Sequence, residues 1–206
     1  MDLQLFLKIK KKYGENVSWA VWEDAGILPK SNIGNIQIFN PESNPGLLNI
    51  LNNNVIMVGL NFARPQRSDD SFINFHDDNG KSNDFKIRYA FRNTQFYGAY
   101  MTDVIKGLIE KSSTEVKKLL KEDPGFVKTN IEKLKEELKF IGSRKPIIIA
   151  FGGEVYTLLK KNFNKEEYSF LIQITHYSDW RHNKEAYRKM VIEQIFSQIG
   201  KDISTS

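Results

Sequence analysis

The chain has 206 residues, of which 27% are charged and 40% hydrophobic, and its formal net charge is +5. This length is enough for one sizeable hydrophobic core, so we expect a single domain over residues 1–206. No apolar run approaches the ~20 residues that cross a bilayer. The N-terminal segment Met1–Lys8 also lacks a basic region before its apolar residues, unlike a secretory signal. We therefore expect a cytoplasmic protein that has no membrane partner.

The cysteine and histidine content excludes several kinds of chemistry. There is no cysteine, so disulfides, cysteine nucleophiles, thiolate zinc sites and cysteine-ligated iron–sulfur clusters are ruled out. The three histidines, His76, His176 and His182, are too few for a histidine-rich metal site. We therefore expect neither a metal nor an iron–sulfur cluster.

The excess of positive charge permits contact with phosphate backbones but does not require it. The sequence pI is about 9.2, and much of the excess lies in Lys8–Lys12 and across residues 106–145. Both runs can equally be read as the solvated faces of helices.

Local signals predict the elements of the N-terminal quarter. Asp2 is suited to cap a helix that ends near Gly14. Val17–Trp22 and Ile33–Phe39 each indicate a short strand. We expect residues 1–50 to form an extension that packs on the core of the same domain.

The stretch Val55–Pro65 is the most informative part of the chain. Val55–Val58 is an unbroken apolar run, typical of a strand buried on both faces. Gly59 allows the backbone to turn, and Asn61 follows at the carboxyl end of the strand. Ligands bind at that edge in open α/β sheets, so Asn61 is a candidate site residue.

The rest of the chain alternates strands and helices. Gln66–Lys86 is polar and irregular, and its length indicates a functional or mobile loop. The further elements are strands at 97–105, 146–153 and 170–174. Two helices are separated by Asp123-Pro-Gly125, the second over Thr129–Phe140, and others are expected at 154–161 and 183–199. This order predicts an α/β fold, a three-layer α/β/α arrangement with a mainly parallel central sheet.

Polar side chains follow three of the predicted strands, namely Asn61, Asp103 and His176. Because the carboxyl ends of parallel strands share one edge, these side chains are expected to converge on one cleft. Each also has a structural interpretation. Asn61 can shape a turn, Asp103 can pair with Lys106 or accept backbone hydrogen bonds, and His176 can be a hydrogen-bonded structural histidine.

Four short motifs follow one another on these elements. In chain order they are Val58-Gly-Leu-Asn61, Ala99-Tyr-Met-Thr-Asp-Val-Ile-Lys106, Pro146-Ile-Ile-Ile-Ala-Phe-Gly-Gly153 and Thr175-His-Tyr-Ser178. Together they resemble the uracil-DNA glycosylase superfamily over about residues 55–200. The first motif is similar to the Gly-Ile-Asn-Pro-Gly element of mismatch-specific members. The second is similar to an Ile-Thr-Asn-Val-Val-Lys strand, and the last to a His-Pro-Ser element.

The resemblance implies a DNA glycosylase-like fold and a hydrolase that releases a damaged or mismatched base. Asn61 would position the attacking water, and His176 would donate a hydrogen bond to the departing base. Gly59, Leu60 and Asp103 would lie against the base. The enzyme would flip its target nucleotide out of the DNA, and we expect it to act as a monomer without a cofactor.

The resemblance also implies an aromatic ring against the flipped base and a surface for the DNA backbone. Phe62, Phe75, Phe91 and Phe96 are candidates for the ring, although the last two can equally be core residues. Ser178 would contact a phosphate. Tyr177, Trp180 and Arg181 would contact the duplex, although Trp180 can also be a packing residue.

The chain departs from the family pattern at three positions and also lacks an acidic catalytic residue in its first motif. Asp103 stands where the family has an asparagine, Tyr177 replaces a proline, and Phe62-Ala63 replaces Pro-Gly. An ionised carboxylate only accepts hydrogen bonds. Asp103 would therefore repel the O4 atom of uracil and would accept from an exocyclic amino group.

Three classes of function remain open at this point. The first is a DNA glycosylase-like enzyme for a base other than uracil. The second is a non-catalytic nucleic-acid-binding module on the same fold. The third is an enzyme that acts on a small nucleotide or nucleobase in the same cleft.

Overall fold

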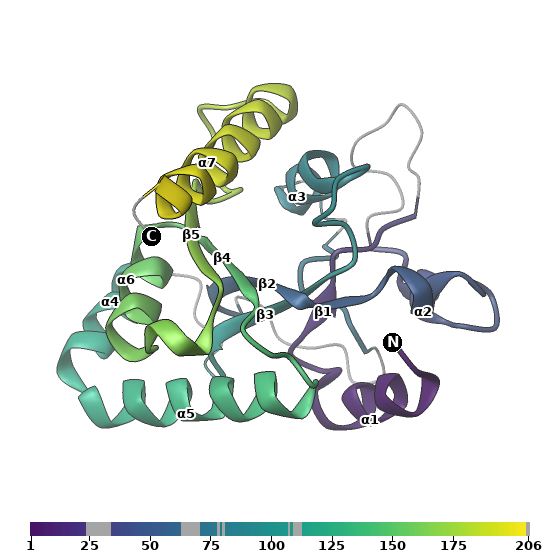
Figure 1. Cartoon of the computed structure of the whole chain (residues 1–206), viewed down its shortest axis with the longest axis horizontal. Coiled ribbons are helices and arrows are strands. Elements are labelled where there is room, and N and C mark those ends of the chain that lie inside the picture. The colour runs from purple at the N-terminus through teal and green to yellow at the C-terminus, as the bar shows by residue number, and fades with distance from the viewer. Residues whose placement is uncertain are drawn as a thin grey trace.

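The computed structural model describes residues 1–23, 34–62, 71–77, 79, 81–106, 108 and 113–204. Within them the chain forms an α/β fold (Figure 1). In order, its elements are α1 (Leu3–Tyr13), β1 (Ser18–Trp19), a 3-10 helix (Ile36–Phe39), α2 (Leu47–Ile50), β2 (Asn52–Asn61), α3 (Asp84–Phe91), β3 (Ala99–Ile105), α4 (Ser113–Glu122), α5 (Pro124–Phe140), β4 (Ile147–Phe151), α6 (Gly153–Asn162), a second 3-10 helix (Lys165–Glu167), β5 (Phe170–Ile174) and α7 (Lys184–Ser204).

The strands form one five-stranded sheet in the order β1-β3-β2-β4-β5. All neighbouring pairs are parallel except the edge pair of β1 with β3. The chain leaves β2 for β3 on one side and then returns past β2 to β4 on the other. In doubly wound sheets, ligands bind at the carboxyl ends of the strands where the order reverses in this way.

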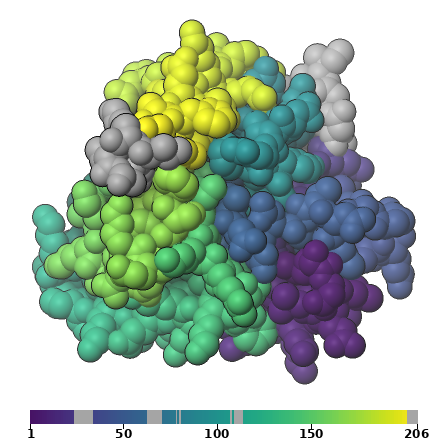
Figure 2. All heavy atoms as spheres, viewed as in Figure 1, coloured from purple at the N-terminus to yellow at the C-terminus, as the bar shows by residue number. Residues whose placement is uncertain are grey.

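The sheet is covered on both faces, which gives a three-layer arrangement (Figure 1). One hydrophobic cluster joins the sheet to α1, α5 and α6, and the other joins it to α3 and α7. In the space-filling view the C-terminal helix (yellow) covers the top of the molecule, and the N-terminal segment (purple) lies at the lower right (Figure 2). Within the described residues, no helix has both the length and the apolar character needed to span a membrane.

The N-terminal segment is part of the sheet and does more than cover it. The predicted helix is confirmed as α1, and the Asp2 side chain accepts a hydrogen bond from the backbone N–H of Leu5. β1 adds an antiparallel edge strand beside β3. The predicted strand over Ile33–Phe39 is wrong, because Ile36–Phe39 is a 3-10 helix whose start is capped by the side chain of Asn35.

Two further differences concern helices. α3 begins at Asp84, inside the segment 66–86 that the polar sequence indicated to be irregular, and residues 66–70, 78 and 80 of that segment lie outside the described residues. α5 begins at Pro124, because the carboxylate of Asp123 accepts a hydrogen bond from the N–H of Phe126. Proline at the first position of a helix costs no intrahelical hydrogen bond.

A buried ion pair fastens α5 to the end of β3. Nζ of Lys106 lies 3.0 Å from Oε2 of Glu137, with side chains that are 14% and 1% exposed. The same ammonium group also contacts Oγ1 of Thr102. Lys106 therefore pairs with Glu137 rather than with Asp103. Loss of one partner from such a pair leaves a charge that is poorly solvated.

We predict that Glu137→Gln lowers the free energy of unfolding by about 3 kcal/mol, because Lys106 then lacks its buried counter-charge. Chemical denaturation of the purified variant measures this change. The matched control is Glu132→Gln on the same helix, since Glu132 lies 4.0 Å from Lys128 in an exposed pair. An exposed pair contributes at most about 1 kcal/mol. Equal losses in the two variants would contradict the prediction.

Candidate functional site

The candidate site begins where β2 and β3 lie side by side near their carboxyl ends. Gly59 pairs in register with Asp103. A Cβ atom at Gly59 would lie 2.1 Å from Oδ1 of Asp103 and 3.3 Å from Cζ of Phe75. The missing side chain of Gly59 therefore creates the space that the carboxyl group and the ring occupy.

Asp103 is a buried carboxyl group with one strong hydrogen-bond donor. Its side chain is 4% exposed, and Nδ2 of Asn74 donates to Oδ2 at 2.7 Å. Burial raises the pKa of Asp103 to about 6, while the hydrogen bond from Asn74 and the charge of Lys106 oppose that rise. The group is therefore poised to change its protonation state just below neutral pH.

Phe75 is held in a strained backbone conformation beside this carboxyl group. Its φ is +64°, and Phe72 in the same segment has a φ of +67°. Such left-handed residues cost about 1–3 kcal/mol each and persist only where neighbouring contacts impose them. Here the contacts come from the N-terminal segment, since Ser18 Oγ donates to Phe72 O at 2.8 Å and His76 Nε2 lies 2.9 Å from Val21 O.

Ring contacts connect Phe75 to the end of β5. The centroid of its ring lies 6.0 Å from that of Phe151 and 6.3 Å from that of Tyr177. Tyr177 in turn stacks on the ring of His176 at 4.3 Å. The aromatic cluster of Phe75, Phe151, His176 and Tyr177 thus brings the His-Tyr-Ser motif to the same region as Gly59 and Asp103.

The hydrogen bonds of His176 define which ring nitrogen carries the proton. The backbone N–H of Ser178 donates to Nδ1 at 3.1 Å, and Oγ of Ser178 lies 2.7 Å from the same atom. Because an N–H group can only donate, Nδ1 is the acceptor and the neutral ring carries its hydrogen on Nε2. Burial lowers the pKa of His176 to about 4, so the ring is neutral at physiological pH and Nε2–H is a donor.

The turn that follows His176 is fixed to α3 and exposes an aromatic side chain. Nζ of Lys86 donates to the carbonyl oxygen of Asp179 at 2.7 Å. The carboxylate of Asp179 pairs with Arg181, at 2.6 Å from Nη2 to Oδ2. Trp180 is 87% exposed, so it is not a packing residue. This turn therefore presents an indole ring and a guanidinium group to solvent.

Of the other predicted site residues, Asn61 lies at the same edge of the sheet, whereas Leu60, Phe91 and Phe96 pack in or against the core. Asn61 ends β2 at the same edge, and its Nδ2 lies 3.4 Å from the carbonyl oxygen of Phe62. Leu60 packs against the core of the opposite face, which contains α1 and α5. Phe91 and Phe96 are buried in the core beside α3 and α7, so neither is the ring at the site.

Three residues of the site have no clear signal in the sequence. Asn74 donates a hydrogen bond to Asp103, and Lys86 donates one to the turn after His176. The ring of Phe151 lies between those of Phe75 and Tyr177 and contacts both. Phe151 ends an apolar run that indicated only a core strand. Asn74 directly precedes the candidate Phe75, and this adjacency is the one hint that the sequence offers.

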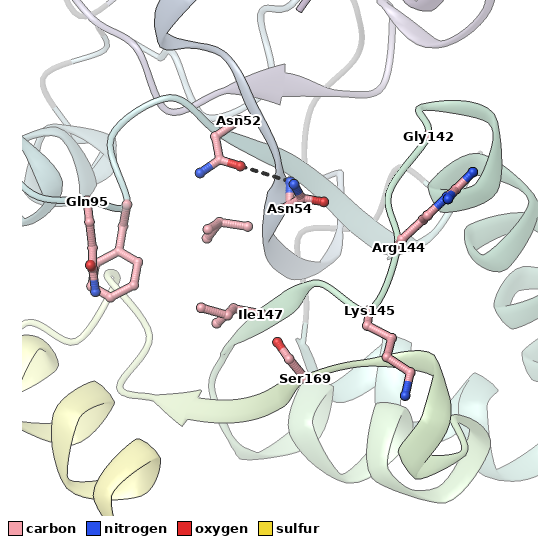
Figure 3. Close-up of a pocket in the computed structure, with 10 residues that line it drawn as sticks. Asn52, Asn54, Gln95, Gly142, Arg144, Lys145, Ile147 and Ser169 are labelled. Atoms are coloured by element: carbon pink, nitrogen blue, oxygen red, sulfur yellow. Dashed lines mark hydrogen bonds between the residues drawn. The ribbon is translucent and has the colours of Figure 1, made fainter.

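A separate cavity of about 690 Å³ lies at the opposite, amino end of the strands. Asn52 and Ser169 lie across it from each other (Figure 3). Arg144 and Lys145 lie on its rim, and their side chains point away from its middle in this view. The two basic side chains of this cavity therefore do not point toward a common centre.

Comparison with known proteins does not assign the chain to a family. No family model matches the sequence, and no match was found among curated proteins or solved structures. Among the described residues, no group of three or more His, Asp or Glu side chains is placed to hold a metal ion.

We predict that Asp103→Asn stabilises the protein at pH 7 by up to about 3 kcal/mol, since the folded pKa of about 6 lies above the ordinary value of 3.8. Between these values the folded chain binds a proton that the unfolded chain does not, so the stability contributed at this site rises as pH falls from about 6 to about 4. The variant and the parent should therefore converge in stability near pH 4.

Urea unfolding of both proteins between pH 4 and pH 8 measures this difference. His176 has the opposite dependence, because its folded pKa of about 4 lies below the ordinary 6.5 and it costs stability as pH falls through this range. The comparison of variant with parent cancels that contribution. A stability gap that did not change with pH would contradict the prediction.

Proposed function

We propose that this protein is a DNA glycosylase-like hydrolase that flips a nucleotide out of DNA and cleaves its base–sugar bond. The observation that carries the proposal is the aromatic cluster that connects Asp103 with His176. Phe75 touches the Gly59–Asp103 region on one side and the Phe151–Tyr177 pair on the other. A polar acceptor, a polar donor and an aromatic ring are the groups that bind a flipped base.

His176 is suited to stabilise the departing base. Cleavage of the bond leaves negative charge on the base, and a neutral donor fixed in advance lowers the barrier by about 3–4 kcal/mol. The hydrogen bond from the N–H of Ser178 leaves Nε2–H as that donor. Asn61, at the end of β2, would hold the attacking water near the sugar carbon.

Asp103 points to a base that has an exocyclic amino group. When ionised it accepts hydrogen bonds only, so it complements an N–H donor and repels a carbonyl oxygen. With a pKa of about 6, the carboxyl group is mainly ionised at pH 7. The proposed substrate is therefore a damaged or mismatched base that bears an amino group, and uracil is disfavoured.

The turn after His176 would contact the DNA duplex. Trp180 is suited to stack on bases, and Arg181 beside it to contact a phosphate. The resemblance to the uracil-DNA glycosylase superfamily supports the same placement, since the matching stretch of that family wedges into the duplex. Tyr177 stacks on His176 and would support it from within the site.

We predict that His176→Ala lowers the rate of base release by about 100- to 1,000-fold, because the donor to the departing base is lost. A single-turnover assay on oligonucleotides with a panel of damaged and mismatched bases measures abasic product after alkaline cleavage. Ser178→Ala is the comparison variant: it loses the hydroxyl but keeps the backbone N–H that fixes the His176 tautomer, so it should lose much less activity than His176→Ala. No abasic product from any lesion at high enzyme concentration would exclude the enzyme function.

We also predict that Asp103→Asn shifts the preference from amino-bearing bases toward bases with a carbonyl oxygen at that position. The amide of asparagine presents a donor where the carboxylate has none. In the parent, the preference for the amino-bearing base should weaken below about pH 6, where Asp103 becomes protonated. Relative rates on the two classes of oligonucleotide, measured from pH 5 to pH 8, test both expectations.

A non-catalytic nucleic-acid-binding module is the second candidate function, and the exposure of Trp180 favours it. Binding to DNA that weakens steeply with salt, is reduced in Trp180→Ala and yields no free base would support this alternative. Loss of binding in Trp180→Ala with normal release of base from a single-stranded oligonucleotide would instead support the enzyme.

A further inference from the structure

Asn74 connects the N-terminal segment to the candidate site through a single amide group. Its side chain is buried, and its Nδ2 lies 2.7 Å from Oδ2 of Asp103 and 3.1 Å from the carbonyl oxygen of Asn16. An amide nitrogen has two hydrogens, so it can donate one to each oxygen. Because both neighbours accept here, the orientation with nitrogen between them is the one that forms two hydrogen bonds.

This contact gives the two carboxyl oxygens of Asp103 different hydrogen-bond surroundings. Oδ2 is engaged by Asn74, whereas Oδ1 lies over Gly59 and accepts no hydrogen bond from any residue that the structure describes. Oδ1 is not one of the fully buried polar atoms that lack a partner in the described part of the chain, so it keeps some accessible surface and can accept a hydrogen bond from a ligand or from water. Oδ1 is therefore the atom of this carboxyl group that a ligand would meet.

The same contact favours the ionised form of Asp103. A donated hydrogen bond stabilises a carboxylate relative to a neutral carboxyl group, and here it opposes the effect of burial. Without Asn74, the remaining favourable charge on this carboxyl group is that of Lys106, which is already paired with Glu137. Asn74 thus affects both the direction and the charge of the Asp103 acceptor.

We propose that Asn74 is a positioning residue that turns Oδ1 of Asp103 toward the ligand, keeps the carboxylate ionised and so selects an amino-bearing base. The selectivity part of this inference rests on the proposed function. The positioning part rests only on the contacts among Asn16, Asn74 and Asp103. It gives the N-terminal segment, which lies outside the resemblance, a direct role in the site.

The experiment is a carbon-13 NMR titration of the Asp103 and His176 side chains in the parent and in Asn74→Ala. Loss of a hydrogen bond to a charged group should raise the Asp103 midpoint by about one pH unit, roughly a tenfold change in the ionisation constant. The His176 midpoint should stay near 4. Asn74→Ser, which retains a donor, should recover part of the shift.

The matched control is Asn53→Ala. Asn53 also donates its amide to a backbone carbonyl, that of Ile141 at 2.6 Å, but near the opposite end of β2. Its loss should leave the Asp103 midpoint unchanged. An unchanged midpoint in Asn74→Ala, an equal shift in Asn53→Ala, or a joint shift of Asp103 and His176 would overturn the positioning role.

Base preference separates this inference from the proposed function. In the single-turnover assay at pH 6.5, Asn74→Ala should lose about tenfold of the parent's preference for amino-bearing over carbonyl-bearing bases. If the midpoint shifts while the parent releases no base, the positioning role stands and the proposed function fails. If base is released and the preference is unchanged in the variant, the selectivity role is wrong.

Discussion

The candidate site depends on the way the N-terminal segment holds residues 72–76. Two phenylalanines there, Phe72 and Phe75, adopt left-handed backbone conformations that phenylalanine ordinarily avoids. Each such residue costs about 1–3 kcal/mol, so the segment would relax if it stood alone. Ser18 donates a hydrogen bond to this segment, and the carbonyl oxygens of Val21, Asn16 and Gly14 accept hydrogen bonds from it. These four contacts supply the opposing stabilisation. The ring of Phe75 and the amide of Asn74 reach the sheet edge because of these contacts.

Two buried carboxyl groups near the end of β3, those of Glu137 and Asp103, differ in how their charge is compensated. Glu137 has an ammonium group 3.0 Å away, so its charge is compensated directly. Asp103 lies on the face that contains α3 and α7. It accepts a hydrogen bond from the amide of Asn74, and the charge of Lys106 acts on it without a direct ion pair. A structural carboxylate is normally compensated in the first way, because burial of an uncompensated charge costs several kcal/mol. The incomplete compensation of Asp103 is therefore better explained by a ligand than by the stability of the fold.

Much of this arrangement could be predicted from the sequence, because it depends on local patterns. The apolar run of β2 predicts Asn61 at the carboxyl edge, and the runs of β3 and β5 place Asp103 and His176 at the ends of their strands in the same way. The strand order and the position of Phe75 beside Gly59 are set by contacts between distant residues, which no local pattern encodes. α3 was missed because its polar start, Asp84, follows a run of acidic and amide residues that is typical of loops. The role of Asn74 depends on Asn16 and Asp103, which are 58 and 29 residues away.

The opposite pKa changes of Asp103 and His176 indicate how the site would work near neutral pH. Burial raises the pKa of the acid to about 6 and lowers that of the histidine to about 4. Above about pH 6 the first group is an ionised acceptor and the second a neutral donor, so both are in the form that the proposed chemistry needs. Pairs of titratable groups whose environments push their pKa values in such directions are typical of catalytic sites. At lower pH the acceptor is lost first, while His176 remains neutral to about pH 4. As pH falls, recognition of the base by Asp103 should therefore be lost near pH 6, whereas stabilisation of the departing base by His176 should persist to about pH 4. The two functions separate because different side chains perform them.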